Sequence, residues 1–262
     1  SIITNNILEG RVSVGNSSQI LDNTITAEVY ADDCVVSNNS IDGSVRGGEI
    51  SNNDITNGGY INGISIVNNH IIGNVAVDDS AVVSGNYIQG GYTSVLKDIP
   101  AVGGFRTAIE IDYGAVYIRS GSPLISNNII DGGITAADPD SPTILNNTII
   151  SSGIYFPNPT VVPPGTFPGY APIYDTADSP VIVNNKVADV IRIKGNYCNI
   201  SGNTANGISI KGGGSYIGGN TVSSGIGIFL LHGGTIKNNN VFGNTNAGIT
   251  VQIASATKFA SA

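Results

Sequence analysis

Short segments in which aliphatic residues alternate with other residues recur along the whole chain. Alternation with a period of two is the pattern of a β-strand, and no stretch keeps apolar residues at helical spacing over several turns. Ile and Val dominate these segments, whereas Gly and Asn, which are poor helix residues, separate them. The predicted fold is therefore all-β. The clearest strands are GISIV from Gly63, AIEID from Ala108, VIRIK from Val190, GISIK from Gly207, GIGIF from Gly225 and GITVQI from Gly248.

An asparagine motif repeats between these segments. Its form is aliphatic, any residue, Asn/Gly/Asp, Asn, any residue, and then usually an aliphatic residue. Successive copies lie 14–19 residues apart, except for two longer steps of 42 and 38 residues. The second asparagine of the motif falls at Asn6, Asn23, Asn39, Asn53, Asn69, Asn86, Asn128, Asn147, Asn185, Asn203, Asn220 and Asn239.

A repeat of this length suits one coil of a parallel β-helix. It is too short for a propeller blade or for a pair of helices. If each long step holds an extra coil, an insertion or both, residues 1–262 form a single domain of roughly 13–15 coils, each ~4.8 Å above the last.

Stacking of the coils gives the repeated residues two structural roles. The recurrent asparagine can take a left-handed bend and hydrogen-bond from coil to coil as a ladder. The aliphatic residue two positions after the asparagine should form one buried column. Its predicted members are Ile25, Ile41, Ile55, Ile71, Ile88, Ile130, Ile149, Val187 and Val222.

The repeats also resemble a known superfamily. The succession ILDNTITA, VVSNNSIDG, IVNNHIIGN, VVSGNYIQGG and IKNNNVFGN is similar to the right-handed parallel β-helix repeats of the pectin-lyase-like superfamily. It is most similar to the short repeats of secreted and surface proteins of archaea and bacteria, including NosD-like periplasmic proteins. The resemblance covers nearly the whole chain and implies a single-stranded, right-handed parallel β-helix. It does not imply one activity, because this scaffold carries lyases, hydrolases, epimerases, tailspikes and adhesins.

Two stretches depart from the repeat and are predicted insertions, one near residues 90–106 and the other near 155–180. The second holds seven of the chain's eleven prolines, which cannot join a sheet ladder, so it should leave the solenoid as a loop. Its aromatic residues have three open roles: stacking on sugar rings, packing on a neighbouring subunit, or covering the solenoid wall. These candidate interface residues are Tyr155, Phe156, Phe167, Tyr170 and Tyr174.

Candidate catalytic residues are few. By resemblance, polyuronate-cleaving members use clustered carboxylates, sometimes with calcium, together with Arg or Lys. The hydrolase motifs NTD and GHG are absent, and RIK at 192–194 lies inside an ordinary alternating strand. A looser cluster near both insertions could bind calcium or transfer protons. It consists of Asp112, Arg119, Asp131, Asp138 and Asp140.

The two histidines do not support a further site. His70 and His232 fall in different coils, so neither a histidine metal site nor a Ser-His triad is expected. Enzymatic activity therefore stays an open question, with a non-catalytic role preferred. No cofactor is expected unless calcium binds the carboxylates.

Composition and charge limit the partners of this chain. It carries 11 Lys and Arg against 19 Asp and Glu, a net charge of −8, so it should repel nucleic acid. No apolar run approaches the ~20 residues of a membrane span. The chain has no Met, which suits a secreted protein whose signal peptide has been removed. We expect an extracellular or cell-surface location.

The cysteines and the glycosylation sequons leave alternatives open. Cys34 and Cys198 each lie five residues before a repeat asparagine, at least eight coil steps apart by the predicted coil count. That is roughly 40 Å at the inter-strand spacing, too far for an intramolecular disulfide. They are either buried thiols or cross-links between neighbouring subunits. Among the sequons, Asn16 and Asn199 are the candidate glycosylation sites.

The repeat runs almost to both ends, from Ile2 to within ten residues of Ala262, and no capping helix is readable. A bare coil end exposes apolar core and unpaired strand edges, which contacts between copies would cover. The chain is therefore expected to be a fragment of a longer protein or a secreted, non-catalytic structural subunit. Such a subunit would self-assemble through its ends, its loops or both into a filament, sheath or surface layer. The alternative is a polysaccharide-acting lyase or hydrolase, or a carbohydrate-binding module.

Overall fold

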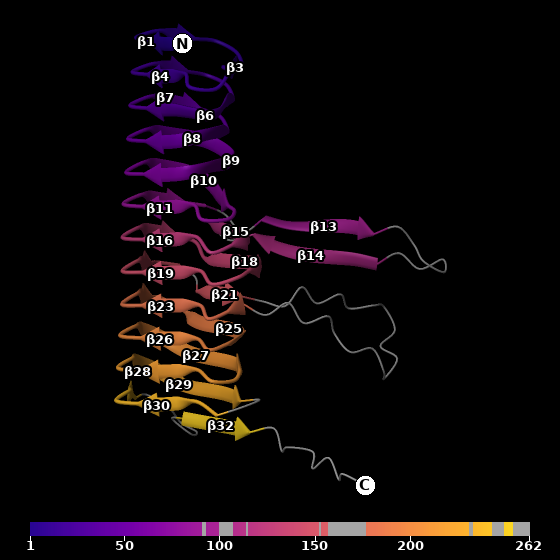
Figure 1. The fold of residues 1–262 in the computed structure, drawn as a ribbon, viewed down its shortest axis with the longest axis vertical. Coiled ribbons are helices and arrows are strands. Elements are labelled where there is room, and N and C mark those ends of the chain that lie inside the picture. The colour runs from indigo at the N-terminus through magenta and orange to yellow at the C-terminus, as the bar shows by residue number, and fades with distance from the viewer. Residues whose placement is uncertain are drawn as a thin grey trace.

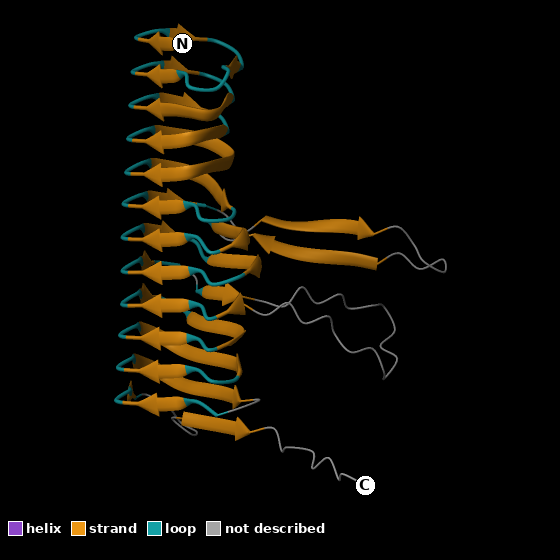
Figure 2. Cartoon of the chain, in the orientation of Figure 1, coloured by secondary structure: helices purple, strands orange, loops and turns teal. Residues whose placement is uncertain are grey.

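In the computed structural model, a column of stacked coils runs the length of the molecule (Figure 1). The structure describes residues 1–90, 93–99, 107–113, 115–151, 153–156, 177–230, 233–242 and 249–253. These residues contain strands and turns but no helix, and Figure 2 shows turns joining the strands at the corners of each coil. Thirty strands belong to one continuous sheet whose pairings are parallel. The prediction of an all-β parallel solenoid is confirmed.

Each coil contributes strands in three positions around the solenoid, and some strands continue around a corner. The strands before the first insertion are β1 (Ile2–Thr4), β2 (Ile7–Leu8), β3 (Val12–Ser13), β4 (Gln19–Leu21), β5 (Thr24–Ile25), β6 (Val29–Ser37), β7 (Ser40–Asp42), β8 (Val45–Ser51), β9 (Asp54–Val67), β10 (His70–Val77), β11 (Val82–Ser84) and β12 (Tyr87–Gln89).

The strands after that insertion continue the same three positions. They are β15 (Val116–Gly121), β16 (Leu124–Ser126), β17 (Ile129–Asp131), β18 (Ile134–Pro139), β19 (Thr143–Leu145), β20 (Thr148–Ile149), β21 (Ile154–Phe156), β22 (Ala177–Asp178), β23 (Val181–Val183), β24 (Lys186–Val187), β25 (Val190–Asn196), β26 (Asn199–Ser201), β27 (Thr204–Gly212), β28 (Tyr216–Gly218), β29 (Thr221–Leu230), β30 (Thr235–Lys237), β31 (Asn240–Val241) and β32 (Ile249–Ile253).

The predicted aliphatic column forms the centre of the core. Ile71 is paired in register with Ile55 on one side and with Ile88 on the other, and each is fully buried. All nine predicted members are buried, and Ala205 completes the column between Val187 and Val222. The neighbouring Ile72 lies outside and is 41% exposed, as strand alternation requires. The predicted strand register is confirmed.

The solenoid has about 11 turns, so the prediction of 13–15 coils is wrong. The long steps of the repeat contain no extra coil. The backbone N–H of Asn86 donates directly to Oδ1 of Asn128, and that of Asn147 donates to Oδ1 of Asn185, each at 2.9 Å. Each long step is thus one turn carrying an excursion. At ~4.8 Å per turn the column is about 50 Å long rather than the 60–70 Å that the larger coil count implies.

The first excursion contains a two-stranded antiparallel ribbon. Strand β13 (Thr93–Ile99) pairs with β14 (Thr107–Tyr113), and this sheet is separate from the solenoid sheet. Figure 1 shows it projecting to one side of the column. The segment AIEID therefore belongs to the ribbon and not, as the sequence had suggested, to a coil. The sequence pattern does not distinguish the two, because a ribbon strand and a coil strand have the same alternation of residues. The second excursion leaves β21 at Phe156 and returns at Ala177, and residues 157–176 lie outside the described residues.

Each repeat asparagine except the last ties its coil to the next, because its backbone N–H and its Nδ2 both donate to Oδ1 of the next repeat asparagine. These bonds together form the asparagine ladder. The backbone N–H and Nδ2 of Asn53 both donate to Oδ1 of Asn69, at 2.9 and 3.0 Å. Nδ2 of Asn53 also lies within donating distance of the Ser51 carbonyl in its own coil and of the Val36 carbonyl in the preceding coil. The ten asparagines from Asn23 to Asn220 are buried, so these bonds replace the water that the amides lose on folding.

The left-handed bend belongs to the residue before each ladder asparagine, and not to the ladder asparagine as expected. At all twelve ladder positions this preceding residue has a φ between 55° and 69°. It is Asn or Asp at nine of these positions and Gly at three, the residue types that tolerate this conformation. The residue before the ladder asparagine varies because only its backbone angle is required. The ladder asparagine does not vary, because its side-chain amide itself makes the hydrogen bonds.

Two neighbouring substitutions test this division of roles. Asn69→Ala removes the acceptor for Asn53 and the donor for the carbonyls of Ile50 and Val67, so it should lower the free energy of unfolding by about 3 kcal/mol or more. Asn68→Gly keeps the left-handed bend and should change it by less than about 1 kcal/mol. Chemical denaturation of both variants gives the comparison. Equal losses at the two positions would contradict the ladder as the stabilising element.

Candidate functional site

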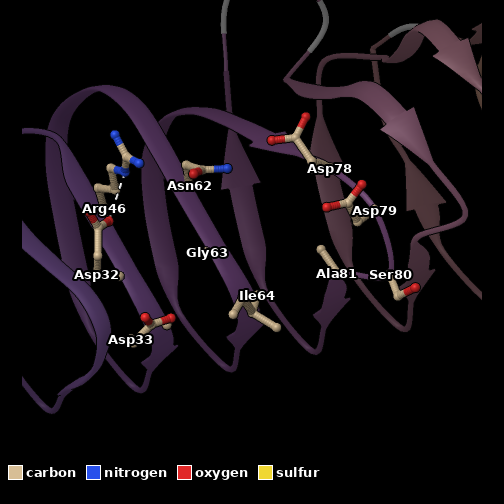
Figure 3. Close-up of a pocket in the computed structure, with 12 residues that line it drawn as sticks. Asp32, Asp33, Arg46, Asn62, Gly63, Ile64, Asp78, Asp79, Ser80 and Ala81 are labelled. Atoms are coloured by element: carbon tan, nitrogen blue, oxygen red, sulfur yellow. Dashed lines mark ion pairs between the residues drawn. The ribbon is translucent and has the colours of Figure 1, made fainter. Parts of the chain in front are cut away.

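A groove of about 550 Å³ lies on the outside of the solenoid, along one corner of its N-terminal half. Figure 3 shows Asp32 and Asp33 on one side of it, Asp78 and Asp79 on the other, and Asn62, Gly63 and Ile64 between them. These residues come from the corners that follow the third strand position of four consecutive coils.

Unequal corner lengths create this groove. In the register of β6 with β8, Asp32, Asp33 and Cys34 stand opposite Gly48 alone. The next corner again has a single residue, Ile64, and the following one has four, residues 78–81. Two bulky corners therefore flank two tight ones, which form the floor. A Cβ on Gly48 would lie 3.1 Å from the backbone of Asp33, so this part of the floor accommodates little beyond glycine.

The groove is polar and carries more negative than positive charge. Nε of Arg46 pairs with Asp32 at 2.8 Å, and Arg119 pairs with Asp78. Arg119 also lies over the ring of Tyr60, 5.5 Å from its centre. Ion pairs this exposed contribute about 0–1 kcal/mol each to stability. The groove therefore offers carboxylates and hydrogen-bonding groups to an extended polar ligand.

The candidate catalytic cluster does not come together as one site among the residues described. Arg119, on β15, pairs with Asp78 instead. Asp131, on β17, accepts a hydrogen bond from Ser151 at 2.6 Å on a different face of the coil. Asp140 is exposed at a corner. The remaining two members lie in described strands, but their side chains are outside the described part: Asp112 on the projecting β14 and Asp138 on β18.

Among the residues that the structure describes, no arrangement is typical of a metal or histidine site. Within the described ranges, no three His, Cys, Asp or Glu side chains lie close enough together to hold a metal ion such as calcium. His70 contacts Asp54 through Nδ1 at 2.7 Å and lies against the ring of Tyr87. His232 is outside the described residues. Arg192 is exposed between the buried Ile191 and Ile193, as an alternating strand requires.

The residues of the groove are not among the predicted site residues, although the sequence contains a signal for it. The acidic pair at 32–33 lies where β6 turns a corner, and the pair at 78–79 directly follows β10 at the same corner of the solenoid. The 14-residue step between Asn39 and Asn53 is the shortest in the chain and marks the tight corner between them. Corner length, read together with corner charge, would have predicted an acidic recess here.

The two cysteines are buried in corresponding corners. Sγ of Cys34 lies 3.0 Å from the carbonyl of Gly15, and Sγ of Cys198 lies 3.3 Å from that of Gly195. Seven ladder steps separate their coils rather than the eight expected, about 34 Å along the axis, which still excludes a disulfide between them. Their burial, at 2% and 1% exposure, favours the interpretation as small apolar residues over that of an intersubunit cross-link.

The remaining candidate positions differ in accessibility. Asn16 lies exposed in a turn, with Nδ2 3.4 Å from Asp33. Asn199 lies in β26 between two neighbouring strands, and its Oδ1 is buried, so its amide is less accessible for glycosylation. Of the candidate interface aromatics, Tyr155 and Phe156 form the end of β21, but their side chains are not described. Phe167, Tyr170 and Tyr174 lie outside the described residues.

The fold and its ladder define the class of the protein: a parallel β-solenoid with one ladder asparagine in each coil. Comparison with known proteins adds nothing more specific, since no family model, curated protein or solved structure matches the chain. In the described ranges, no helix is long and apolar enough to span a membrane.

Thiol accessibility tests the placement of the cysteines. Because both thiols are buried in the folded chain, we expect a thiol-specific reagent to modify them slowly in native protein and rapidly after denaturation. The two rates can be followed by mass spectrometry. Non-reducing electrophoresis of native protein should show a single monomer band. A ladder of bands that collapses on reduction would contradict this placement and favour the cross-link.

Proposed function

We propose that this chain is a secreted, non-catalytic structural subunit that self-assembles outside the cell into a filament, sheath or surface layer. We further propose that its repeats belong with the right-handed β-helix repeats of the pectin-lyase-like superfamily, of the NosD-like kind. The proposal of self-assembly rests on one observation about the ends of the asparagine ladder. One end has an Oδ1 acceptor and the other a backbone N–H donor, the two groups that bond to each other between successive coils.

The ladder has a direction along the solenoid axis. In every coil but the last, the asparagine donates its N–H to Oδ1 of the asparagine in the next coil. Oδ1 of Asn6 accepts no hydrogen bond from the residues described, and the N–H of Asn239 has no such acceptor there. One end therefore offers an acceptor and the other a donor. A second copy stacked on the first would continue the ladder without a break.

The apolar columns support the same contact. Ile3 and Ile236 are the end members of the column that contains Ile20, and both are only partly buried. Leu8 and Val241 likewise end the column that contains Ile71. End-to-end stacking would place aliphatic side chains of two copies against each other in both columns. Covering such apolar surface favours association by ~25 cal/mol per Å².

A pair of adjacent substitutions tests the end contact. Leu8→Lys places a charge in the apolar end surface and should reduce association at least about tenfold, because the charge would have to be desolvated on stacking. Ile7→Lys is the matched control, since Ile7 points outward and is 78% exposed. Light scattering and electron microscopy measure association over a range of concentrations. A chain that stays monomeric at high concentration, or equal effects of both substitutions, would overturn the proposal.

The corner groove is the observation that supports the alternative function, which is cleavage or binding of a polysaccharide. Its aspartates would repel polyuronates, so we expect no binding of acidic oligosaccharides by calorimetry and no release of unsaturated products. Neutral oligosaccharides provide the comparison ligand. Binding or turnover that is lost in Asp78→Asn would favour this alternative over a purely structural role.

A further inference from the structure

Charge is distributed unevenly along the solenoid axis. The first 90 residues, which form the N-terminal coils up to β12, carry ten acidic and two basic side chains. Residues 179–242, which form the C-terminal coils from β23 to β31, carry one acidic and five basic side chains. Because the coils are stacked in sequence order (Figure 1), this difference in the sequence becomes a separation of charge along the molecule. The column is negative towards its N-terminal end and positive towards its C-terminal end.

The separation reaches the end coils themselves. Residues 1–42 carry six carboxylates, all on exposed residues, against one arginine. Residues 199–242 carry Lys211 and Lys237, both exposed, and no acidic residue. Nζ of Lys237 lies 5.4 Å from the centre of the Tyr216 ring on the outer face of the neighbouring coil. The two end surfaces thus have formal charges of −5 and +2 from side chains alone.

We infer that these opposite charges orient copies of the chain head to tail, with the C-terminal coils of one copy against the N-terminal coils of the next. This inference rests on the proposed self-assembly and adds an electrostatic contribution to the orientation of the copies, which makes association depend on salt. The partner is a second copy of the chain, because the same molecule carries the ladder donor with the positive end and the ladder acceptor with the negative end.

The range of the electrostatic interaction fits this arrangement. At physiological ionic strength charges are screened over about 8 Å, which is roughly two coils. Attraction between unlike ends would raise the rate of productive encounters. Two N-terminal ends would repel each other, as would two C-terminal ends, so stacking in the wrong direction is disfavoured by charge as well as by the polarity of the ladder.

Charge reversal at each end tests the inference. Glu9→Lys, Glu28→Lys and Asp42→Lys together change the N-terminal end from −5 to +1, by reversing three of its six carboxylates. Lys211→Glu with Lys237→Glu changes the C-terminal end from +2 to −2. Each variant alone should associate at least about tenfold more weakly than the parent chain at low salt. An equimolar mixture should recover association, because each interface in an alternating stack then joins unlike charges.

A charge change far from the ends provides the control. Lys186→Glu with Arg192→Glu alters the net charge by the same amount as the C-terminal variant, but these exposed residues lie three ladder steps, about 14 Å, before the last coil. Light scattering at low and high salt should show near-parental association for this control, and weaker association of the parent chain as salt rises. Circular dichroism checks that every variant is folded.

The outcomes separate this inference from the proposed function. Association that is insensitive to salt and to both end variants would overturn the charge mechanism and leave self-assembly standing. A folded mixture that does not recover association would also overturn it, as would a control as weak as the end variants. A parent chain that stays monomeric at low salt and high concentration would overturn both.

Discussion

The structure depends on a buried asparagine amide that must find hydrogen-bond partners in every coil. Its Oδ1 accepts from the backbone and side chain of the asparagine in the coil before. Its Nδ2 lies within donating distance of the next asparagine and of carbonyls in its own and the preceding coil. A coil that shifted in register would leave several of these buried groups unpaired, at about 1–3 kcal/mol each. The ladder thus fixes where each coil lies on the last, and the aliphatic columns follow from that register.

Because the ladder constrains only one bend of each coil, the rest of the coil can vary. The 42-residue step from Asn86 to Asn128 carries the β13–β14 ribbon and still makes the same ladder bonds as a step of 16 residues. The corners after the third strand position vary from one residue to four, and this variation creates the acidic groove. Surface features of the protein are therefore set by corners and excursions, while the stacked core stays constant.

Hydrogen bonding and charge have the same polarity along this molecule. The end that offers the asparagine acceptor is also the negative end, and the end that offers the asparagine donor is also the positive end. Ladder bonds act at contact distance and would set the register of two copies, whereas charge acts over several ångströms and would set their orientation before contact. Together they would make each copy a directional subunit of the proposed assembly.

The sequence by itself determined the repeat, the strand class and the core, because each is a local pattern that recurs. The spacing of asparagines such as Asn53 and Asn69 predicted the ladder, and the aliphatic residue two positions later predicted the buried column through Ile71. Only the tertiary structure decided the number of turns, since a long spacing between two ladder asparagines can contain either an extra coil or an excursion. It alone also brought Arg119 to Asp78 and put the left-handed bend one residue before the ladder asparagine. Those features depend on which corners come to lie side by side and on how the chain bends within a turn, and a one-dimensional period does not contain that information.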